Sequence, residues 1–313
     1  MILGAIKLLI LFLIFPGFIF AALVGLFTSW VDRKISARVQ YRQGPPWYQP
    51  FADILKLFGK EIFIPEGGAS FIFLAAPWLG LSAVTLVATM LWQFNVHPAG
   101  SFIGDLIVVL YLFTVPSLAL MLGGSASRNP LAAIGASREM KLILAYELPF
   151  LLAIFTLVAK SGSILIGSVV AFQQSHGMLA LSLSGMLALL VSILVMQAKL
   201  GFVPFDIPEA EQELMAGPLL EYSGLPLAVF KLTKALLFYT LPLFLITLYL
   251  GGFNPYSWVG ILGLVIKYVL LLVIIILIKN TNPRIRTDQA LRFFWGPVTI
   301  LAAAGFIFAL IGW

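Results

Sequence analysis

The chain alternates between long apolar stretches and shorter polar connections, and this alternation predicts eight membrane-spanning helices. A helix that crosses a bilayer needs about 17–25 predominantly apolar residues, and each stretch meets this length. Helices are expected because hydrocarbon offers backbone amides no partner, and the sequence lacks the short alternating segments of a membrane β-barrel. The expected spans are 4–28, 71–94, 102–123, 142–159, 178–198, 225–250, 256–278 and 293–313.

Composition supports the same fold class, an all-α integral membrane protein in which residues 1–313 form a single polytopic domain. Of the 313 residues, 61% are hydrophobic and 10% are charged, whereas soluble domains carry about 25% charged residues. Such a chain has too little polar surface to be soluble. It also has no cysteine, which excludes disulfides, thiolate catalysis, iron–sulfur ligation and cysteine zinc sites within this chain.

Positive charges gather in alternate connections. The first, third, fifth and seventh connections hold 14 of the 19 lysines and arginines, whereas the opposite side has Lys7 and Lys160. By the positive-inside rule, the odd-numbered connections lie in the cytoplasm and both termini lie outside, as in a multi-pass protein of the plasma membrane. The net charge of +6 is then a signal of topology, and nucleic acid is not an expected partner.

The first connection contains a short helix of its own. Over 51–60, the apolar residues Phe51, Ile54, Leu55 and Phe58 fall on one helical face and the charged residues fall on the other. This pattern predicts an amphipathic helix that lies at the membrane surface after the first span. Such a helix serves either as an interfacial anchor or as the wall of a cavity or a dock for a soluble partner.

The fifth connection is acidic. Residues 201–224 hold five of the 13 acids and no base, namely Asp206, Glu209, Glu211, Glu213 and Glu221. Pro208 suits the first turn of a helix and Gly217-Pro218 suits its end, which places Glu209 and Glu213 on one face at i,i+4 spacing. One interpretation is an ordinary solvated loop, in which acids are common because they stabilise the N-terminus of a helix. The other is a charge cluster that is buried or faces a partner. We favour the cluster, because an acidic cytoplasmic loop otherwise faces anionic lipid.

Several charged residues interrupt the apolar spans. Glu147 lies in the fourth span with Glu139 eight residues earlier at its edge, and Lys267 lies near the middle of the seventh span. A charge at the centre of a spanning helix costs at least about 2.5–3.5 kcal/mol, and such residues usually face the bundle interior and mark ion or proton paths. We therefore interpret these three as candidate proton carriers. A structural ion pair or a snorkelling side chain explains the others equally well, namely Lys231, Lys234 and Asp105.

The charged segments together carry a resemblance. The acidic connection reads PFDIPEAEQEL over 204–214 and EYSG over 221–224, the fourth span contains AYELP over 145–149, and the seventh connection contains RIRTDQ over 284–289. These motifs, and the pattern of the first connection over 33–57, resemble the complex I subunit 1 family. That family includes the membrane anchor subunits of energy-converting nickel–iron hydrogenases, and its eight spans agree with the hydropathy pattern.

Two departures from the quinone-reducing members favour one branch of the family. The link over 44–50, GPPWYQP, is shorter than theirs, and the acidic connection reads Glu211-Gln212-Glu213-Leu214 and continues through Gly217-Pro218. Both features are similar to the anchors of membrane-bound hydrogenases and of the related sulfur-reducing complex. A quinone-binding subunit of a complex I-type NADH or F420H2 dehydrogenase is the alternative within the family.

The resemblance implies a subunit that connects two arms of a complex. Hydrogenase-like large and small soluble subunits, with iron–sulfur proteins, would dock on the cytoplasmic connections, and antiporter-like membrane subunits would move protons or sodium alongside. Iron–sulfur clusters and nickel–iron then belong to the partner subunits. This chain is expected to be a non-catalytic subunit of an oxidoreductase, with no cofactor or metal of its own, embedded in membrane lipid.

The same resemblance divides the charged residues into two groups. Proton relay or coupling is expected from Glu139, Glu147, Asp206, Glu209, Glu211, Glu213, Glu221 and Lys267. Docking of the soluble arm is expected from Arg33, Arg38, Arg42, Arg284, Arg286 and Asp288. Two rival hypotheses of other classes stand beside this one: a stand-alone ion-coupled secondary transporter, and a purely structural anchor.

Overall fold

The computed structural model describes residues 2–312, with the side chains of residues 2–5 and 211 excepted, and this part of the chain is helical without a strand. The α-helices are α1 Ile2–Leu13, α2 Phe18–Val39, α3 Gln49–Phe58, α4 Ser70–Val96, α5 Asp105–Leu112, α6 Val115–Ala126, α7 Pro130–Ser161, α8 Ile166–His176, α9 Leu183–Lys199, α10 Glu211–Leu214, α11 Gly224–Tyr249, α12 Trp258–Thr281, α13 Thr287–Phe293 and α14 Thr299–Ile311. Short 3₁₀ turns are η1 Pro98–Gly100, η2 Leu179–Leu181 and η3 Gly217–Leu219, and the π-helical turn η4, Phe294–Val298, joins α13 to α14.

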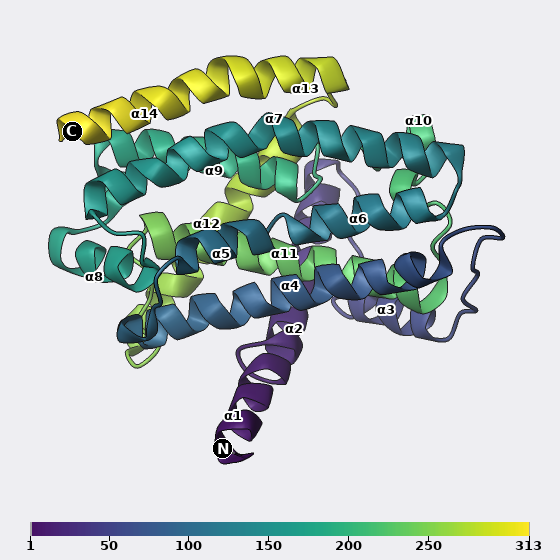
Figure 1. The fold of residues 1–313 in the computed structure, drawn as a ribbon, viewed down its shortest axis with the longest axis horizontal. Coiled ribbons are helices and arrows are strands. Elements are labelled where there is room, and N and C mark those ends of the chain that lie inside the picture. The colour runs from purple at the N-terminus through teal and green to yellow at the C-terminus, as the bar shows by residue number, and fades with distance from the viewer. Residues whose placement is uncertain (1, 313) are drawn as a thin grey trace.

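The helices α4, α6, α7 and α14 lie side by side along the long axis of the molecule, and α1 extends away from the bundle (Figure 1). α11 is central: it is buried along nearly its whole length and packs against α2, α4 and α9. On the other side, α7 packs against α6, α9 and α14. The elements α3, α10 and α13 lie toward one end of the bundle, whereas α8 and the C-terminus lie at the other (Figure 1).

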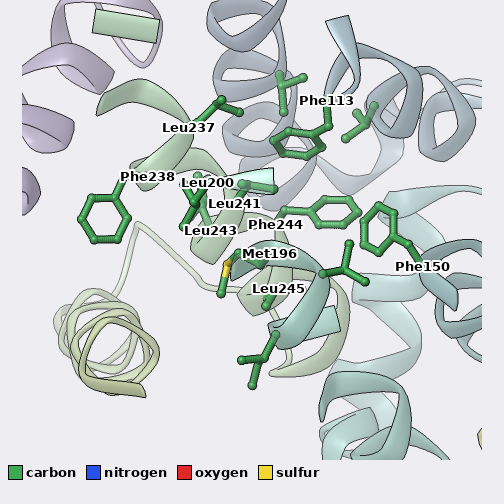
Figure 2. Close-up of a cluster of buried hydrophobic side chains, with 14 of the residues drawn as sticks. Phe113, Phe150, Met196, Leu200, Leu237, Phe238, Leu241, Leu243, Phe244 and Leu245 are labelled. Atoms are coloured by element: carbon green, nitrogen blue, oxygen red, sulfur yellow. The ribbon is translucent and has the colours of Figure 1, made fainter. Parts of the chain in front are cut away.

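Aromatic and aliphatic side chains from separate helices meet around α11 (Figure 2). The ring of Phe244 on α11 lies 5.2 Å from that of Phe113 and 6.2 Å from that of Phe150 on α7, measured between centroids. Met196 and Leu200, from the end of α9, belong to the same cluster. This packing fixes the depth and rotation of α7, α9 and α11, which carry buried charges.

The hydropathy pattern is confirmed for seven spans. Seven helical segments are long and apolar enough to cross a membrane, and they begin at residues 6, 70, 105, 130, 224, 258 and 287. The predicted fifth span, 178–198, corresponds to η2 and α9, and α9 is shorter, with 17 residues. An eighth crossing therefore stays a prediction.

The helix of the first span runs further than its apolar stretch. The sequence places Arg33, Lys34 and Arg38 in a connection, whereas α2 continues to Val39 and includes all three. That placement was wrong because arginine, lysine and alanine are good helix formers, so the helix outlasts the apolar positions. Similarly, α7 begins at Pro130, so Arg138 and Glu139 belong to a helix and not to a loop.

The predicted helix after the first span is α3, but it buries a different face. Pro50, Ile54 and Leu57 are buried, whereas Leu55 and Phe58 are exposed by 69% and 51%. The helix begins at Gln49, two residues earlier than predicted. Its buried face is the one that packs against α2 and α11. Its location at a membrane surface stays a prediction.

Asp105 has a structural position. Its fully buried carboxylate accepts hydrogen bonds from the backbone N–H of Ile166, at 3.0 and 3.2 Å, and from that of Leu106. Ile166 is the first residue of α8, and the N–H groups of the first turn of a helix have no partner within the helix. Asp105 therefore caps α8, a helix that the sequence pattern did not predict, from the neighbouring span.

Candidate functional site

The acidic connection is an extended segment and not the predicted helix from Pro208 to Gly217. Only α10, Glu211–Leu214, is α-helical within it. Met215 and Gly217 have φ of +59° and +52°, which a right-handed helix excludes. A Cβ at Gly217 would lie 1.9 Å from the carbonyl oxygen of Pro208, so the chain folds back on itself at this glycine.

Two acids of this segment reach basic residues far away in the sequence. The carboxylate of Asp206 lies 2.7 Å from Arg284, in the connection between α12 and α13. Glu209 accepts a hydrogen bond from the ammonium of Lys234 on α11 at 2.6 Å. The segment is thus tied to two other elements by ion pairs, as expected of a buried charge cluster and not of a solvated loop.

The remaining acids of the segment point elsewhere. Glu213 pairs with Arg138 on α7, so it does not share a face with Glu209 as predicted. Glu221 accepts a hydrogen bond from the side chain of Asn129, the residue that caps α7. The predicted relay residue Glu211 lies outside the described side chains.

Glycines on α6 and α7 leave room for the end of the acidic segment to pack closely against these helices. A Cβ at Gly135 on α7 would lie 2.6 Å from the ring of Pro218, and a Cβ at Gly123 on α6 would lie 2.2 Å from the hydroxyl of Tyr222. That hydroxyl donates to the carbonyl of Phe73 at 2.9 Å, and the two rings stack at 4.0 Å. Close approach of the segment to α4, α6 and α7 therefore depends on these glycines.

Gly135→Ala is expected to lower the unfolding temperature of the protein in detergent by several degrees, because the added methyl group meets the backbone of the acidic segment. Gly263→Ala on α12 is the matched control, since a Cβ there has open space and alanine favours a helix over glycine by about 1 kcal/mol. Thermal unfolding followed by circular dichroism measures both. Equal unfolding temperatures for the two variants would contradict the conclusion that the segment packs closely against Gly135.

A cavity of about 540 Å³ opens between α2, α3, α7, α11 and the acidic segment. One part of its wall is apolar and includes Leu26, Ile54, Phe230 and Phe238. The charged part of its wall consists of Asp32, Asp53, Glu139, Asp206, Glu209, Arg33, Lys199, Lys231, Lys234 and Lys279. Five carboxylates and five cations thus surround one space inside a largely apolar bundle.

Ion pairs hold most of these carboxylates. Asp32 lies 2.6 Å from Lys279 on α12, and Asp53 lies 2.8 Å from Arg33. With the pairs of Asp206 and Glu209, four of the five acids have a cation, whereas Glu139 forms no ion pair with any described residue. Glu139, one of the predicted relay acids, is therefore the acid of this wall that has a hydroxyl, that of Ser117, and not a cation as its partner.

A further ion pair joins α9 to α7. The ammonium of Lys199, at the end of α9, lies 3.3 Å from Glu147 and 4.8 Å from the centre of the Tyr146 ring. The sequence predicted Glu147 as a carrier but treated Lys199 as a sign of topology. Lys199 ends an apolar run, where a lysine is usually exposed at the membrane edge. Its burial follows from the packing of α9 against α7 and could not be predicted from the sequence.

Acids outside the spans show opposite pKa shifts. Burial raises the pKa of Asp206, and the charge of Arg284 offsets this only in part. Burial also acts on Asp53, but hydrogen bonds from Arg33 and Gln49 outweigh it and hold the pKa of Asp53 below its ordinary value. Of these two acids, Asp206 is thus the one that accepts a proton more readily.

Lys267 lies away from the cavity. Its ammonium donates to the carbonyls of Leu250 and of Gly252, the latter at 3.1 Å, just beyond the end of α11. A lysine in this position neutralises the negative end of a helix dipole. The structure does not bring Lys267 together with Glu139 and Glu147, and its part in the relay stays a prediction.

A smaller cleft of about 310 Å³ lies where the predicted docking residues meet the acidic segment. Its charged wall consists of Arg138, Asp206, Glu213, Arg284, Arg286 and Asp288. Arg38 and Arg42 are exposed and lie outside this wall, and Arg33 faces the larger cavity. Asp206 lines both the cleft and the larger cavity, so the two spaces share one carboxylate.

Comparison with known proteins places the chain in a family. A family model described as NADH dehydrogenase matches residues 9–310. The chain is 35% identical to NADH-quinone oxidoreductase subunit 8 of Thermus thermophilus, over 91% of this chain and 82% of that protein. It is 34% identical to a subunit of the NADH-quinone oxidoreductase of Carboxydothermus hydrogenoformans, over 88% of this chain and 81% of that protein.

A solved structure shares the fold. A chain of the membrane-bound sulfane sulfur reductase, an archaeal respiratory membrane complex, superposes with a TM-score of 0.84 at 32% identity. The match covers 96% of this chain and 97% of that one. This arrangement of helices is therefore that of a subunit in a respiratory membrane complex.

Proposed function

Because this chain belongs to the NADH dehydrogenase family of complex I subunit 1, we propose that it is the membrane anchor and coupling subunit of a complex I-like redox complex. In this proposal it docks a soluble redox arm and relays redox-driven changes in charge or proton occupancy to ion-translocating membrane subunits. The odd-numbered connections face the cytoplasm, and both termini lie outside.

One observation carries this proposal: the carboxylate of Asp206 lines both the cleft that faces the docking residues and the cavity that contains Glu139. A change in charge at the docking face therefore acts directly on a group in the wall of the inner cavity. Two unit charges about 4 Å apart at an effective dielectric of about 20 interact by about 4 kcal/mol. An interaction of that size is enough to shift a proton equilibrium by orders of magnitude.

The relay then runs inward from the cleft. Asp206 and Glu209 respond first because both belong to the acidic segment, and each is held by a cation that a proton would release. Glu139 follows as the acid of the cavity wall that has no ion pair among the described residues. Glu147, paired with Lys199 two helical turns further along α7, ends the series.

The partners in this proposal are soluble subunits of the hydrogenase-like large and small type with iron–sulfur proteins, and antiporter-like membrane subunits. Iron–sulfur clusters, and nickel–iron in a hydrogenase, belong to the soluble arm. Three arginines in the cleft wall, Arg138, Arg284 and Arg286, supply the donors with which such an arm is bound. The similarity to a chain of a sulfane sulfur reductase complex supports the hydrogenase and sulfur-reductase branch.

Co-purification tests the proposal. The chain, tagged and purified in mild detergent from its native membranes, is expected to bring with it soluble iron–sulfur proteins and antiporter-like subunits, identified by mass spectrometry. Nickel in the complex would assign it to the hydrogenase type. Purification of the chain alone, with intact ion transport in liposomes, would instead establish the stand-alone transporter.

Quinone binding is the second candidate, because the relatives from Thermus thermophilus and Carboxydothermus hydrogenoformans are both subunits of NADH-quinone oxidoreductases. The apolar part of the cavity wall supplies a surface that an isoprenoid quinone would need. Reduction of a short-chain quinone by the purified complex, blocked by inhibitors of quinone sites, would establish this function. Electron transfer to protons or sulfur species without quinone reduction supports the first proposal.

A further inference from the structure

Lys199 is the most deeply buried cation in the cavity wall. Its side chain is 2% exposed, compared with 34% for Lys234. Its ammonium makes one hydrogen bond in the described part of the chain, to Glu147, and otherwise faces the rings of Tyr146 and Phe150 at 4.8 and 5.1 Å. A lysine ammonium has three donors, so this buried charge is held by few strong contacts and is free to exchange them.

Glu139 is the acid that such a cation would serve. It is 9% exposed, it lines the same cavity as Lys199, and its charge acts on Lys199. No described residue forms an ion pair with it, although Lys199 holds the carboxylate two helical turns further along α7. A buried ionised carboxylate without a counter-ion is costly, so Glu139 attracts Lys199 whenever it is ionised.

The path between the two carboxylates is polar. Glu139 and Glu147 lie eight residues apart on α7, which is about 12 Å along a helix. Tyr146 is fully buried on the same helix, the charges of Glu139 and Glu147 both act on its hydroxyl, and the hydroxyl of Ser117 lies beside it. A hydroxyl can both donate and accept, so this one is placed to pass a proton from one carboxyl to the other.

We propose that Lys199 is a two-position cation that exchanges its ion pair between Glu147 and Glu139, an inference that rests on the proposed coupling function. In the first state, Glu139 is protonated and Lys199 pairs with the ionised Glu147. In the second state, Lys199 pairs with the ionised Glu139, and Glu147 carries the proton. One proton moves inward from Glu139 to Glu147, and the ammonium moves outward without losing a proton.

This exchange keeps the three groups Lys199, Glu139 and Glu147 neutral as a set. Each state contains one protonated carboxyl, one carboxylate and one ammonium, so neither state leaves an uncompensated charge in the bundle, which would cost several kcal/mol. The other charged groups near Glu139 are Glu209 and Lys234, whose charges act on it with opposite signs. The helix α14, which packs against both α7 and α9, carries no charged residue.

Glu209 is thus the switch that biases the exchange. Its negative charge disfavours an ionised Glu139, and it also engages Lys234. Removing the charge of Glu209, by a proton or by substitution, is expected to favour the second state. Infrared difference spectroscopy of the purified complex tests this, because it detects the carbonyl stretch of protonated carboxyl groups. Glu139→Gln and Glu147→Gln assign the two bands.

In Glu209→Gln, we expect the band of Glu139 to lose intensity and that of Glu147 to gain the same amount. Adding Lys199→Met is expected to abolish the gain at Glu147, whereas Lys199→Arg is expected to retain it. Glu66→Gln, at an exposed position on the connection before α4, is the control and should change neither band. A Glu147 band that does not respond to Glu209→Gln, or that responds equally in the presence of Lys199→Met, overturns the proposal.

A second pair of variants tests the exchange without Lys199→Met, which matters if that variant assembles poorly. In Glu139→Gln, the Glu147 band is expected to become insensitive to Glu209→Gln, because the second carboxylate of the exchange is gone. The measurement needs no electron transfer. Failure of the coupling function would appear in the co-purification experiment, whereas failure of the cation exchange would appear in these spectra.

Discussion

Replacing Arg284 with alanine is expected to release the soluble arm from the membrane subunit. The guanidinium of Arg284 lies 2.7 Å from Asp206 in the wall of the docking cleft. Its loss leaves a half-buried carboxylate without its cation and removes one donor from the docking face. A hydrogen bond from this guanidinium to a charged group of the soluble arm contributes about 1.5–3 kcal/mol, so its loss corresponds to at least about a tenfold loss of affinity.

The measurement is the fraction of soluble subunits that stays with the tagged chain after a high-salt wash, quantified by mass spectrometry. Arg292→Ala is the matched control, because Arg292 is exposed on α13 and does not line the cleft. If the variant retains the soluble subunits as well as the unaltered complex does at every salt concentration, Arg284 does not contribute to docking.

Replacing Lys234 with methionine is expected to uncouple ion movement from electron transfer by about tenfold. The variant leaves Glu209 in the cavity without its cation, and it removes a positive charge that lowers the pKa of Asp206. Without Lys234 the pKa of Asp206 rises further, so Asp206 stays protonated to a higher pH and responds to the redox arm only in more alkaline solution.

The pH profile of ion movement per electron checks this prediction in liposomes that contain the purified complex. The acid limb of the profile is expected to shift to higher pH in Lys234→Met and to stay in place in Lys234→Arg, which retains the charge. Lys56→Met, at an exposed position of α3, is the control. An unshifted profile in Lys234→Met would show that Glu209 and Asp206 do not depend on this lysine.

The helices themselves could be predicted from the sequence, because apolar length and membrane thickness are linked by simple geometry. The existence of α3 and of seven long apolar helices follows from that pattern. Helix ends did not follow from it, since α2 continues through Arg33 to Val39 after its apolar positions end. Hydropathy records which residues tolerate lipid, whereas helix ends also depend on propensity and capping.

The pairing of charges could not be predicted. Asp32 and Lys279 are 247 positions apart in the chain yet lie 2.6 Å apart, and no periodicity in the sequence connects them. Both were absent from the predicted site, as was Lys199. The motif resemblance found the acids because it identified them as a set, but their counter-ions depend on how the helices pack.

The conformation of the acidic segment was missed for a local reason. Pro208 and Gly217-Pro218 are compatible with the start and end of a helix, and they were interpreted in that way. In the structure, positive φ angles at Met215 and Gly217 reverse the chain instead, so Glu209 faces the cavity and Glu213 faces Arg138. Tertiary contacts decided between two local conformations that the same residues allow.

The most direct test of a coupling subunit is the number of ions moved per electron in liposomes that contain the purified complex, driven by a reduced viologen dye and followed with a membrane-potential dye. Glu139→Gln is expected to lower this ratio at least tenfold while assembly and electron transfer continue, because the unpaired acid of the cavity wall is lost. Glu66→Gln should leave the ratio unchanged. A normal ratio in Glu139→Gln would contradict the account.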